Sequence, residues 1–288
     1  MKWFDENLYR SLGTGYTQRF EVTRVVCREK TDYQELMIFE TPSFGRVLAL
    51  DGIIQTTEKD EFAYHEMLAH VPLFAHGTPA RVLIVGGGDG GILREVLRHR
   101  TVEKATLVEI DRTVVERCRK HLPSLNVGAF EDPRTELVIA DGIEYVAQSD
   151  ETFDVIIIDS TDPMGPGEGL FGKTFYADCK RRLGGGGVLA AQNGVPFFQA
   201  DELVRTRQRL MPIFSDVAFY ATAVPTYVGG LMALAFATDD ARLRRLSEVV
   251  IGERFAAAGF GTRYYTPGIH IAAFTLPRFL EELQGSGC

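Results

Sequence analysis

The first sixty residues contain short runs of β-prone residues, each bounded by turn-forming residues. The runs cover 19–27, 35–40, 46–50 and 53–57, and Pro42, Gly45, Asp51 and Gly52 stand between them. Short β-prone runs separated by such turns are typical of antiparallel strands. We therefore expect a small antiparallel β domain over residues 1–60.

The pattern changes after residue 60. Apolar residues at helical spacing predict a helix over 60–76, with Phe62, Met67, Leu68 and Val71 on or near one face. After residue 79, strand-like runs alternate with helical ones, and two late runs at 217–224 and 231–237 flank a glycine pair as a β-hairpin would. Residues 61–288 are thus predicted to form an α/β domain whose parallel sheet ends in an antiparallel hairpin.

Four acidic residues stand at the ends of successive predicted strands. They are Asp89, Glu109, Asp141 and Asp159. The carboxyl ends of parallel strands share one edge of an open α/β sheet, and ligands bind in the crevice there. We expect these four carboxylates to surround one pocket. A pocket of that charge favours a cationic ligand over a phosphate.

Composition narrows the choice of partners. The formal charge of −8 arises from 39 acidic and 31 basic residues without a basic run, which argues against nucleic acid. No apolar stretch reaches the roughly 18 residues that span a bilayer, and the start lacks the apolar core of a signal peptide. We therefore expect no membrane partner and a cytoplasmic location. The 4 cysteines form no Cys-x-x-Cys pair, which argues against a disulfide framework and a zinc site.

A glycine-rich loop follows the first strand of the α/β region. Gly86, Gly88 and Gly91 match the dinucleotide fingerprint Gly-x-Gly-x-x-Gly, with Glu109 at the spacing of a ribose-binding acid. Asp89 would then lie beside a pyrophosphate, a repulsion on the order of several kcal/mol. A nucleoside that carries a sulfonium instead of phosphates fits this acidic loop better. The alternative that Glu109 only caps a strand or pairs with an arginine remains open.

The segment after Asp159 is long, irregular and rich in glycine and proline. Such segments in compact domains are usually functional or disordered. A carboxylate at the root of a segment with glycine and proline hinges is typical of a lid over a reactive centre. We expect a lid over 160–171, although an ordinary turn at Asp162 and Pro163 is the alternative.

Five motifs in order resemble the polyamine aminopropyltransferases, and most closely the bacterial spermidine synthases. They lie at 50–62, 64–67, 82–95, 159–166 and 225–227, and the similarity extends over nearly the whole chain. The resemblance implies a methyltransferase-like Rossmann domain after the N-terminal β domain. It also implies transfer of the aminopropyl group of decarboxylated S-adenosylmethionine, a co-substrate, to putrescine without a prosthetic group, and a homodimer or homotetramer.

The resemblance further implies a role for each site residue. The thioadenosine part of the donor would be held by Gln34, Glu109, Asp141, Gly142 and Pro166. The amino end of the aminopropyl group would face Asp89 and Asp159. The diamine would lie among Tyr64, His65, Asp162 and Tyr227, with Ser160 and Thr161 at the root of the lid and Gln55 and Gln192 as weaker candidates.

The chemistry requires a base. A diamine is an ammonium at neutral pH, with a pKa near that of lysine, about 10.4. Asp159 is the best-placed proton acceptor, while Asp162 would hold the amine. Asp89 would repel the carboxylate of ordinary S-adenosylmethionine and so discriminate between donors. No metal is required.

Other functions compete with this interpretation. A zinc hydrolase is disfavoured because His65 and His70 are five residues apart, roughly 140° around a helix, instead of four. An NAD-dependent oxidoreductase would explain the glycine loop but not Asp89. A diamine N-methyltransferase would use ordinary S-adenosylmethionine, and a polyamine sensor would bind diamines without turnover.

Overall fold

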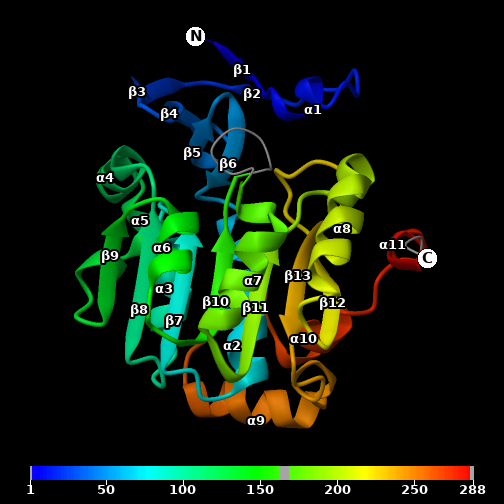
Figure 1. The fold of residues 1–288 in the computed structure, drawn as a ribbon. Helices are drawn as coiled ribbons and strands as arrows, with labels where there is room; N and C mark the ends of the chain where they lie inside the picture. The colour runs from blue at the N-terminus through cyan, green and yellow to red at the C-terminus, as the bar shows by residue number, and fades with distance from the viewer. Residues whose placement is uncertain (1, 162–168, 286–288) are drawn as a thin grey trace.

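The N-terminal part consists of two small antiparallel sheets. The computed structural model describes residues 2–161 and 169–285 (Figure 1). One sheet pairs β1 (Trp3–Asp5) with β2 (Arg19–Glu21), and the helix α1 (Leu8–Ser11) lies between them in sequence. The other contains β3 (Arg24–Lys30), β4 (Glu35–Thr41), β5 (Gly45–Leu50) and β6 (Ile53–Thr57). The predicted run 19–27 is therefore divided between two sheets, and β1 is too short for alternation to reveal it.

The α/β part is built on one seven-stranded sheet in the order β12-β13-β11-β10-β7-β8-β9. Its strands are β7 (Arg81–Gly86), β8 (Lys104–Glu109), β9 (Thr135–Ile139), β10 (Phe153–Asp159), β11 (Leu183–Gln192), β12 (Asp216–Thr222) and β13 (Met232–Thr238). Five neighbouring strands are parallel, and β13 runs antiparallel to both β11 and β12. The predicted fold class is confirmed. The second strand of the hairpin, however, joins the parallel sheet, so the first becomes the edge.

Helices cover both faces of this sheet. The helices α2 (Glu61–His76), α3 (Gly91–Leu97), α9 (Glu248–Ala258) and α10 (Pro267–Ala273) contribute to one apolar core. The helices α6 (Gly142–Gln148), α7 (Lys173–Arg182), α8 (Pro196–Leu210) and α11 (Arg278–Gly285) contribute to the other. Successive strand residues alternate between the cores, as side chains of a strand must. In the part of the chain described, no helix has the length and apolarity needed to cross a membrane.

The helix α2 is more enclosed than its sequence predicts. Fourteen of its sixteen residues are buried, because the sheet, α3 and α9 all pack against it. Polar side chains of α2 therefore find partners inside the protein instead of facing solvent. Tyr64 and His65 stand on its first turns, near the carboxyl edge of the sheet.

The strand ends meet as predicted for a parallel sheet. Asp159 at the end of β10 pairs in register with Gly86 of β7, and Glu109 at the end of β8 pairs with Ile139 of β9. The strand order reverses between β7 and β10, the position where open α/β sheets bind ligands. In Figure 1 the blue N-terminal strands lie above this edge. The helices α4 (Arg112–His121) and α5 (Pro123–Asn126) contact them through an apolar cluster.

Candidate active site

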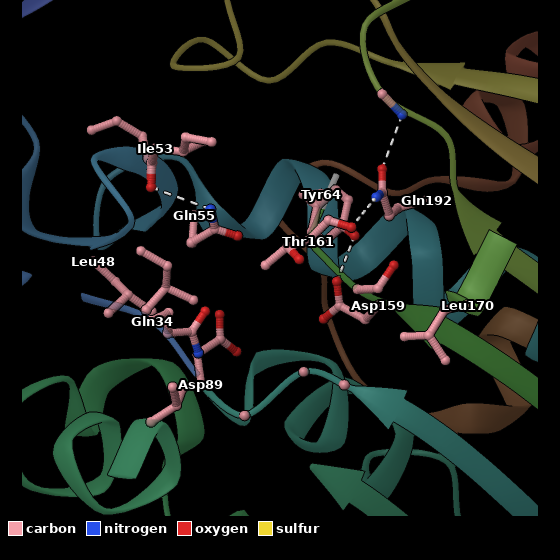
Figure 2. A pocket seen from close by; sticks show the side chains of 18 of the residues that line it. Gln34, Leu48, Ile53, Gln55, Tyr64, Asp89, Asp159, Thr161, Leu170 and Gln192 are labelled. Atoms are coloured by element: carbon pink, nitrogen blue, oxygen red, sulfur yellow. Dashed lines mark hydrogen bonds between the residues drawn. The ribbon is translucent and has the colours of Figure 1, made fainter. Parts of the chain in front are cut away.

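One pocket lies between the N-terminal strands and the carboxyl edge of the large sheet (Figure 2). Every predicted site residue that the structure describes lines it: Gln34, Tyr64, His65, Asp89, Glu109, Asp141, Gly142, Asp159, Ser160, Thr161 and Tyr227. The weaker candidates Gln55 and Gln192 line it too. Asp162 and Pro166, and with them most of the predicted lid, lie outside the described residues. Side chains far apart in the sequence thus share one cavity.

The glycine loop brings side chains together. Gly86 has a φ of 85°, and a Cβ there would lie 2.1 Å from the carbonyl oxygen of Asp159. A Cβ on Gly91 would lie 2.2 Å from the imidazole of His65. The N–H of Gly91 donates to Asp89 Oδ1 at 2.7 Å. This donor, at the start of α3, is therefore already used by a carboxylate, which argues against the dinucleotide alternative.

Three of the four strand-end acids are held by the backbone in the same way. Each accepts a hydrogen bond from the N–H two residues further on: Asp89 from Gly91, Glu109 from Asp111 at 2.9 Å, and Asp141 from Ile143 at 2.7 Å. Such local bonds fix the orientation of each carboxylate.

Glu109 has an unusual protonation equilibrium. Burial raises its pKa to about 7, although backbone N–H groups of Asp111, Ile110 and Gly88 oppose the shift. Within the described chain Glu109 forms no ion pair with an arginine, which argues against the alternative that it only pairs with an arginine. The alternative that Glu109 caps the strand is partly confirmed, because one of its oxygens accepts a hydrogen bond from the backbone N–H of Asp111.

Asp159 is held differently, by a side chain. The hydroxyl of Tyr64 donates to Asp159 Oδ1 at 2.5 Å, a bond drawn in Figure 2. Burial raises the pKa of Asp159 to about 6 and the Asp89 carboxylate adds to the rise, while His65 and the Tyr64 hydroxyl oppose it. Asp159 is therefore a carboxylate at neutral pH that still has appreciable basicity.

His65 stands between two carboxylates. Its Nδ1 is 2.6 Å from Glu61 Oε2, and its Nε2 is 3.4 Å from Asp89 Oδ2. Burial disfavours its charge, but Asp89 and Glu61 together raise its pKa to about 10. Burial likewise opposes the charge of Asp89, yet His65 and the Gly91 N–H hold the pKa of Asp89 below its usual value. Both groups are thus charged at neutral pH.

The zinc alternative finds no support in the helix geometry. His65 faces the pocket, whereas His70 contacts His99 at 3.0 Å and Glu95 at 3.0 Å inside the protein. Among the residues described, no group of three or more His, Cys, Asp or Glu side chains is arranged to hold a metal ion.

Two acids near the pocket escaped the sequence analysis. Glu6 is 2% exposed, lines the pocket from the N-terminal segment, and accepts the N–H of Ile54 at 3.0 Å and the amide of Gln18. Asp111 accepts from Gln34 Nε2 at 3.1 Å and so ties the N-terminal sheet to α4. Neither belongs to a recognisable motif, so only their three-dimensional positions identify them.

A third buried acid, Asp60, supports the pocket from behind. Its Oδ2 accepts both the N–H and the hydroxyl of Thr226, at 2.9 and 2.7 Å. The next residue, Tyr227, donates its hydroxyl to the carbonyl of Gln55 and packs edge-on against Tyr64 at 5.9 Å. Asp60 therefore fixes the loop that carries one wall of the pocket.

Comparison with known proteins identifies close relatives. Residues 61–246 match the model of the spermine/spermidine synthase domain, and residues 2–58 match that of the spermidine synthase tetramerisation domain. A polyamine aminopropyltransferase of Salmonella schwarzengrund is 56% identical over 274 residues, covering 95% of this chain and 96% of its own. One of Shigella flexneri serotype 5b is 54% identical over 285 residues, 99% and 98% of the two chains.

Solved structures agree with the sequence relatives. A spermidine synthase in complex with the transition state analogue AdoDATO superposes with a TM-score of 0.92 at 42% identity, covering 98% of this chain and 94% of its own. The spermidine synthase from Thermotoga maritima gives a TM-score of 0.90 at 40% identity, with the same coverage of 98% and 94%.

Proposed function

The chain belongs to the spermine/spermidine synthase family and is an aminopropyltransferase, and from that premise we propose the following reaction. It moves the aminopropyl group of decarboxylated S-adenosylmethionine to putrescine and releases spermidine and 5'-methylthioadenosine. The observation that carries this assignment is the unequal set of carboxylates around one pocket. Asp159 has a raised pKa, whereas Asp89 stays ionised beside it.

The reaction is a displacement at a carbon activated by a sulfonium. The free amine of putrescine attacks the methylene next to sulfur, a C–N bond forms and the C–S bond breaks. Its electron pair returns to sulfur, which becomes the neutral thioether of methylthioadenosine. The amine becomes free when Asp159 takes a proton from the ammonium before the attack, and the product forms as a secondary ammonium.

The size of the pKa gap explains why an enclosed pocket is needed. An alkyl ammonium has a pKa of about 10.4, and that of Asp159 is about 6. The difference makes direct proton transfer unfavourable by about 6 kcal/mol. Burial of the ammonium lowers its pKa and narrows the gap. The hydroxyls of Tyr64 and Tyr227 and the carboxylate of Asp162 hold the amine in line with the reacting carbon.

The two ends of the pocket bind different parts of the two substrates. At the nucleoside end, Glu109 accepts the ribose hydroxyls and Asp141 the adenine amino group, with Gln34, Gly142 and Pro166 around them. At the amine end, Glu6 receives the second ammonium of the diamine. Glu6 suits that role because it is a buried carboxylate on the pocket wall.

Asp89 selects the donor. It faces the amino end of the aminopropyl group, where ordinary S-adenosylmethionine carries an extra carboxylate, and two like charges in an enclosed site repel. This filter favours aminopropyl transfer over diamine N-methylation. A sensor without turnover would have no need of a carboxylate with a raised pKa such as Asp159.

We also assign the chain to a homodimer or homotetramer. Support comes from the matched tetramerisation domain and from exposed apolar side chains near it, among them Tyr16 and Phe197, which are 42% and 67% exposed. Light scattering of the purified protein distinguishes a dimer or a tetramer from a monomer, and a monomer at micromolar concentration would refute the assignment.

A cytoplasmic location is the remaining part of the proposal. The free thiols of Cys27, Cys118 and Cys179 suit a reducing compartment. Cell fractionation tests this, and recovery of the protein outside the cytoplasm would contradict it.

One assay tests the reaction. Decarboxylated and ordinary S-adenosylmethionine are each offered with putrescine, cadaverine, agmatine and spermidine, and the products are resolved by mass. We expect an aminopropyl adduct of putrescine with the decarboxylated donor alone. A methylated amine, or no adduct with any amine, would reject the proposed reaction.

A further inference from the structure

A buried row of alternating charges extends from α3 to the pocket. Arg94 NH2 lies 2.8 Å from Glu61 Oε2, and the same oxygen lies 2.6 Å from His65 Nδ1. The other imidazole nitrogen lies 3.4 Å from Asp89 Oδ2. Glu61 itself does not line the pocket, and its side chain is 7% exposed. The order is cation, anion, cation, anion, and of these four residues His65 and Asp89 line the pocket.

Glu61 is held firmly enough to orient the imidazole. Arg94 is itself fixed by the carbonyl of Leu125 at 2.6 Å and by Glu95 at 2.8 Å. Burial opposes the charge of Glu61, but His65 and Arg94 hold its pKa below the usual value. On the other side, the imidazole packs against Gly91, where no side chain competes for the space. The ring therefore has a carboxylate at each nitrogen.

We propose that Glu61 is a positioning residue of the reaction: it holds His65 with both ring nitrogens donating, and through His65 it keeps Asp89 ionised beside Asp159. The role of Asp159 in this inference rests on the proposed function. The charge arrangement does not, because it follows from the contacts of Glu61, His65 and Asp89 alone.

The consequence is that two neighbouring carboxylates, Asp89 and Asp159, differ in protonation. The groups that face His65 are Glu61 on its own helix, Asp89 from the glycine loop and, further away, Asp159 of β10. With His65 charged, Asp89 stays a carboxylate and Asp159 alone takes up a proton. With His65 neutral, the two carboxylates lose their nearby cation and compete for one proton at a higher pH.

The first test measures the charge of His65 directly. The ring nitrogens of the 6 histidines are followed by NMR between about pH 5 and pH 11 in the parent and in the Glu61→Gln variant, and His65 is assigned with His65→Gln. We expect the parent His65 to keep both ring protons through neutral pH and the variant to lose one at a midpoint lower by roughly three to four pH units, at or below neutral pH. An unchanged midpoint would overturn the inference.

The matched control is Glu66→Gln, on the same helix. Glu66 is equally buried, but its carboxylate accepts the N–H groups of Arg263, Tyr264 and Tyr265 at 2.7 to 2.8 Å, outside the pocket. It should leave the His65 midpoint where the parent has it. A shift of equal size in this control would show that general loosening, not the Glu61 charge, sets the protonation of His65.

The second test is the pH profile of turnover. Removal of the cation beside the Asp89 and Asp159 pair raises the pKa of the pair, so Glu61→Gln should move the acidic limb of kcat/KM upward by about one pH unit. Glu61→Asp retains the charge and should return the limb part of the way. An acidic limb at the parental pH in Glu61→Gln would overturn the positioning role. Failure of the parent to transfer an aminopropyl group would instead count against the proposed function, because the NMR titration needs no turnover.

Discussion

The acids at the nucleoside end of the pocket and Asp159 at the amine end are held in different ways. Glu109 and Asp141 each accept a backbone N–H from a residue two positions further on. Asp159 is held by the Tyr64 hydroxyl, from a residue 95 positions earlier in the chain. The local backbone thus fixes the groups proposed to bind the nucleoside, while contacts between distant elements adjust the basicity of the group proposed to react. Changes at the two ends should therefore have different kinetic signatures.

The largest effect is expected at the amine end. Asp159→Asn keeps the shape and the bond to Tyr64 but cannot take a proton, so kcat should fall by roughly 10²-fold or more. Binding of methylthioadenosine should stay within about twofold, and turnover should recover in part from pH 7 to pH 10 as free amine becomes available. Steady-state kinetics and calorimetry check both.

Asp154→Asn is the matched control for this strand. Asp154 is also on β10, but at its other end, where it accepts the N–H groups of Ala80 and Arg81 at 2.7 and 2.9 Å. It should leave kcat nearly unchanged. A near-parental rate in Asp159→Asn at pH 7 would remove the base assignment.

A smaller effect of another kind is expected at the nucleoside end. Glu109→Gln replaces a charged acceptor of ribose hydroxyls and should weaken methylthioadenosine binding by about 2 kcal/mol, about thirtyfold, at pH 8. The rate at saturating donor should change little. Calorimetry on the variant decides this, with Glu136→Gln on the exposed side of β9 as control. Affinity within about twofold of the parent would place Glu109 outside the site.

The raised pKa of Glu109 adds a pH dependence to this end. Because that pKa is about 7, the carboxylate form, which accepts the hydroxyls, is lost as pH falls through 7. Methylthioadenosine should therefore bind the parent about tenfold more weakly at pH 6 than at pH 8. Glu109→Gln should show no such trend. A parent affinity independent of pH would contradict the assigned role.

Donor selection should respond to Asp89 and not to Asp141. Asp89→Asn retains the acceptor for Gly91 but loses its charge, so the preference for decarboxylated over ordinary S-adenosylmethionine should narrow by about tenfold. Asp141→Asn makes the same replacement at the nucleoside end and should keep the parental preference. If both variants discriminate as sharply as the parent, the filter lies elsewhere.

The smallest effect is expected where the N-terminal sheet meets the pocket. Asp111→Asn loses the oxygen that accepts from Thr31 at 2.7 Å and Gln34 at 3.1 Å. Donor affinity should fall by about fivefold, or about 1 kcal/mol. Asp132→Asn is the control, because Asp132 does not line the pocket and pairs with Arg134. An unaffected donor affinity would show that Gln34 needs no such support.

Sequence patterns predicted the local elements and the acids at strand ends, and missed contacts between segments that are distant in the sequence. The four strand-end acids were visible because parallel strands share an edge, and the strand-like runs that alternate with helical runs after residue 79 predicted a parallel sheet. The predicted helix places Glu61 one turn before His65, but nothing in the sequence indicated that Asp89 lies at the other ring nitrogen, since Asp89 comes from a separate segment, the glycine loop. Glu6 also escaped notice, because it follows β1, a strand of 3 residues that is too short to show a period. The sequence predicted a helix with one apolar face over 60–76, but α2 is buried on nearly all sides because α3, α9 and the sheet pack against it.

A double-mutant cycle tests the division of the pocket most directly. Asp159 and Glu109 end strands on either side of β7, which places their backbones about 10 Å apart. Asp159→Asn and Glu109→Gln are made separately and together, and kcat/KM for the decarboxylated donor is measured with saturating putrescine. If the two ends act independently, the losses of transition-state free energy add to within about 0.5 kcal/mol. A coupling of about 1 kcal/mol or more would contradict the account.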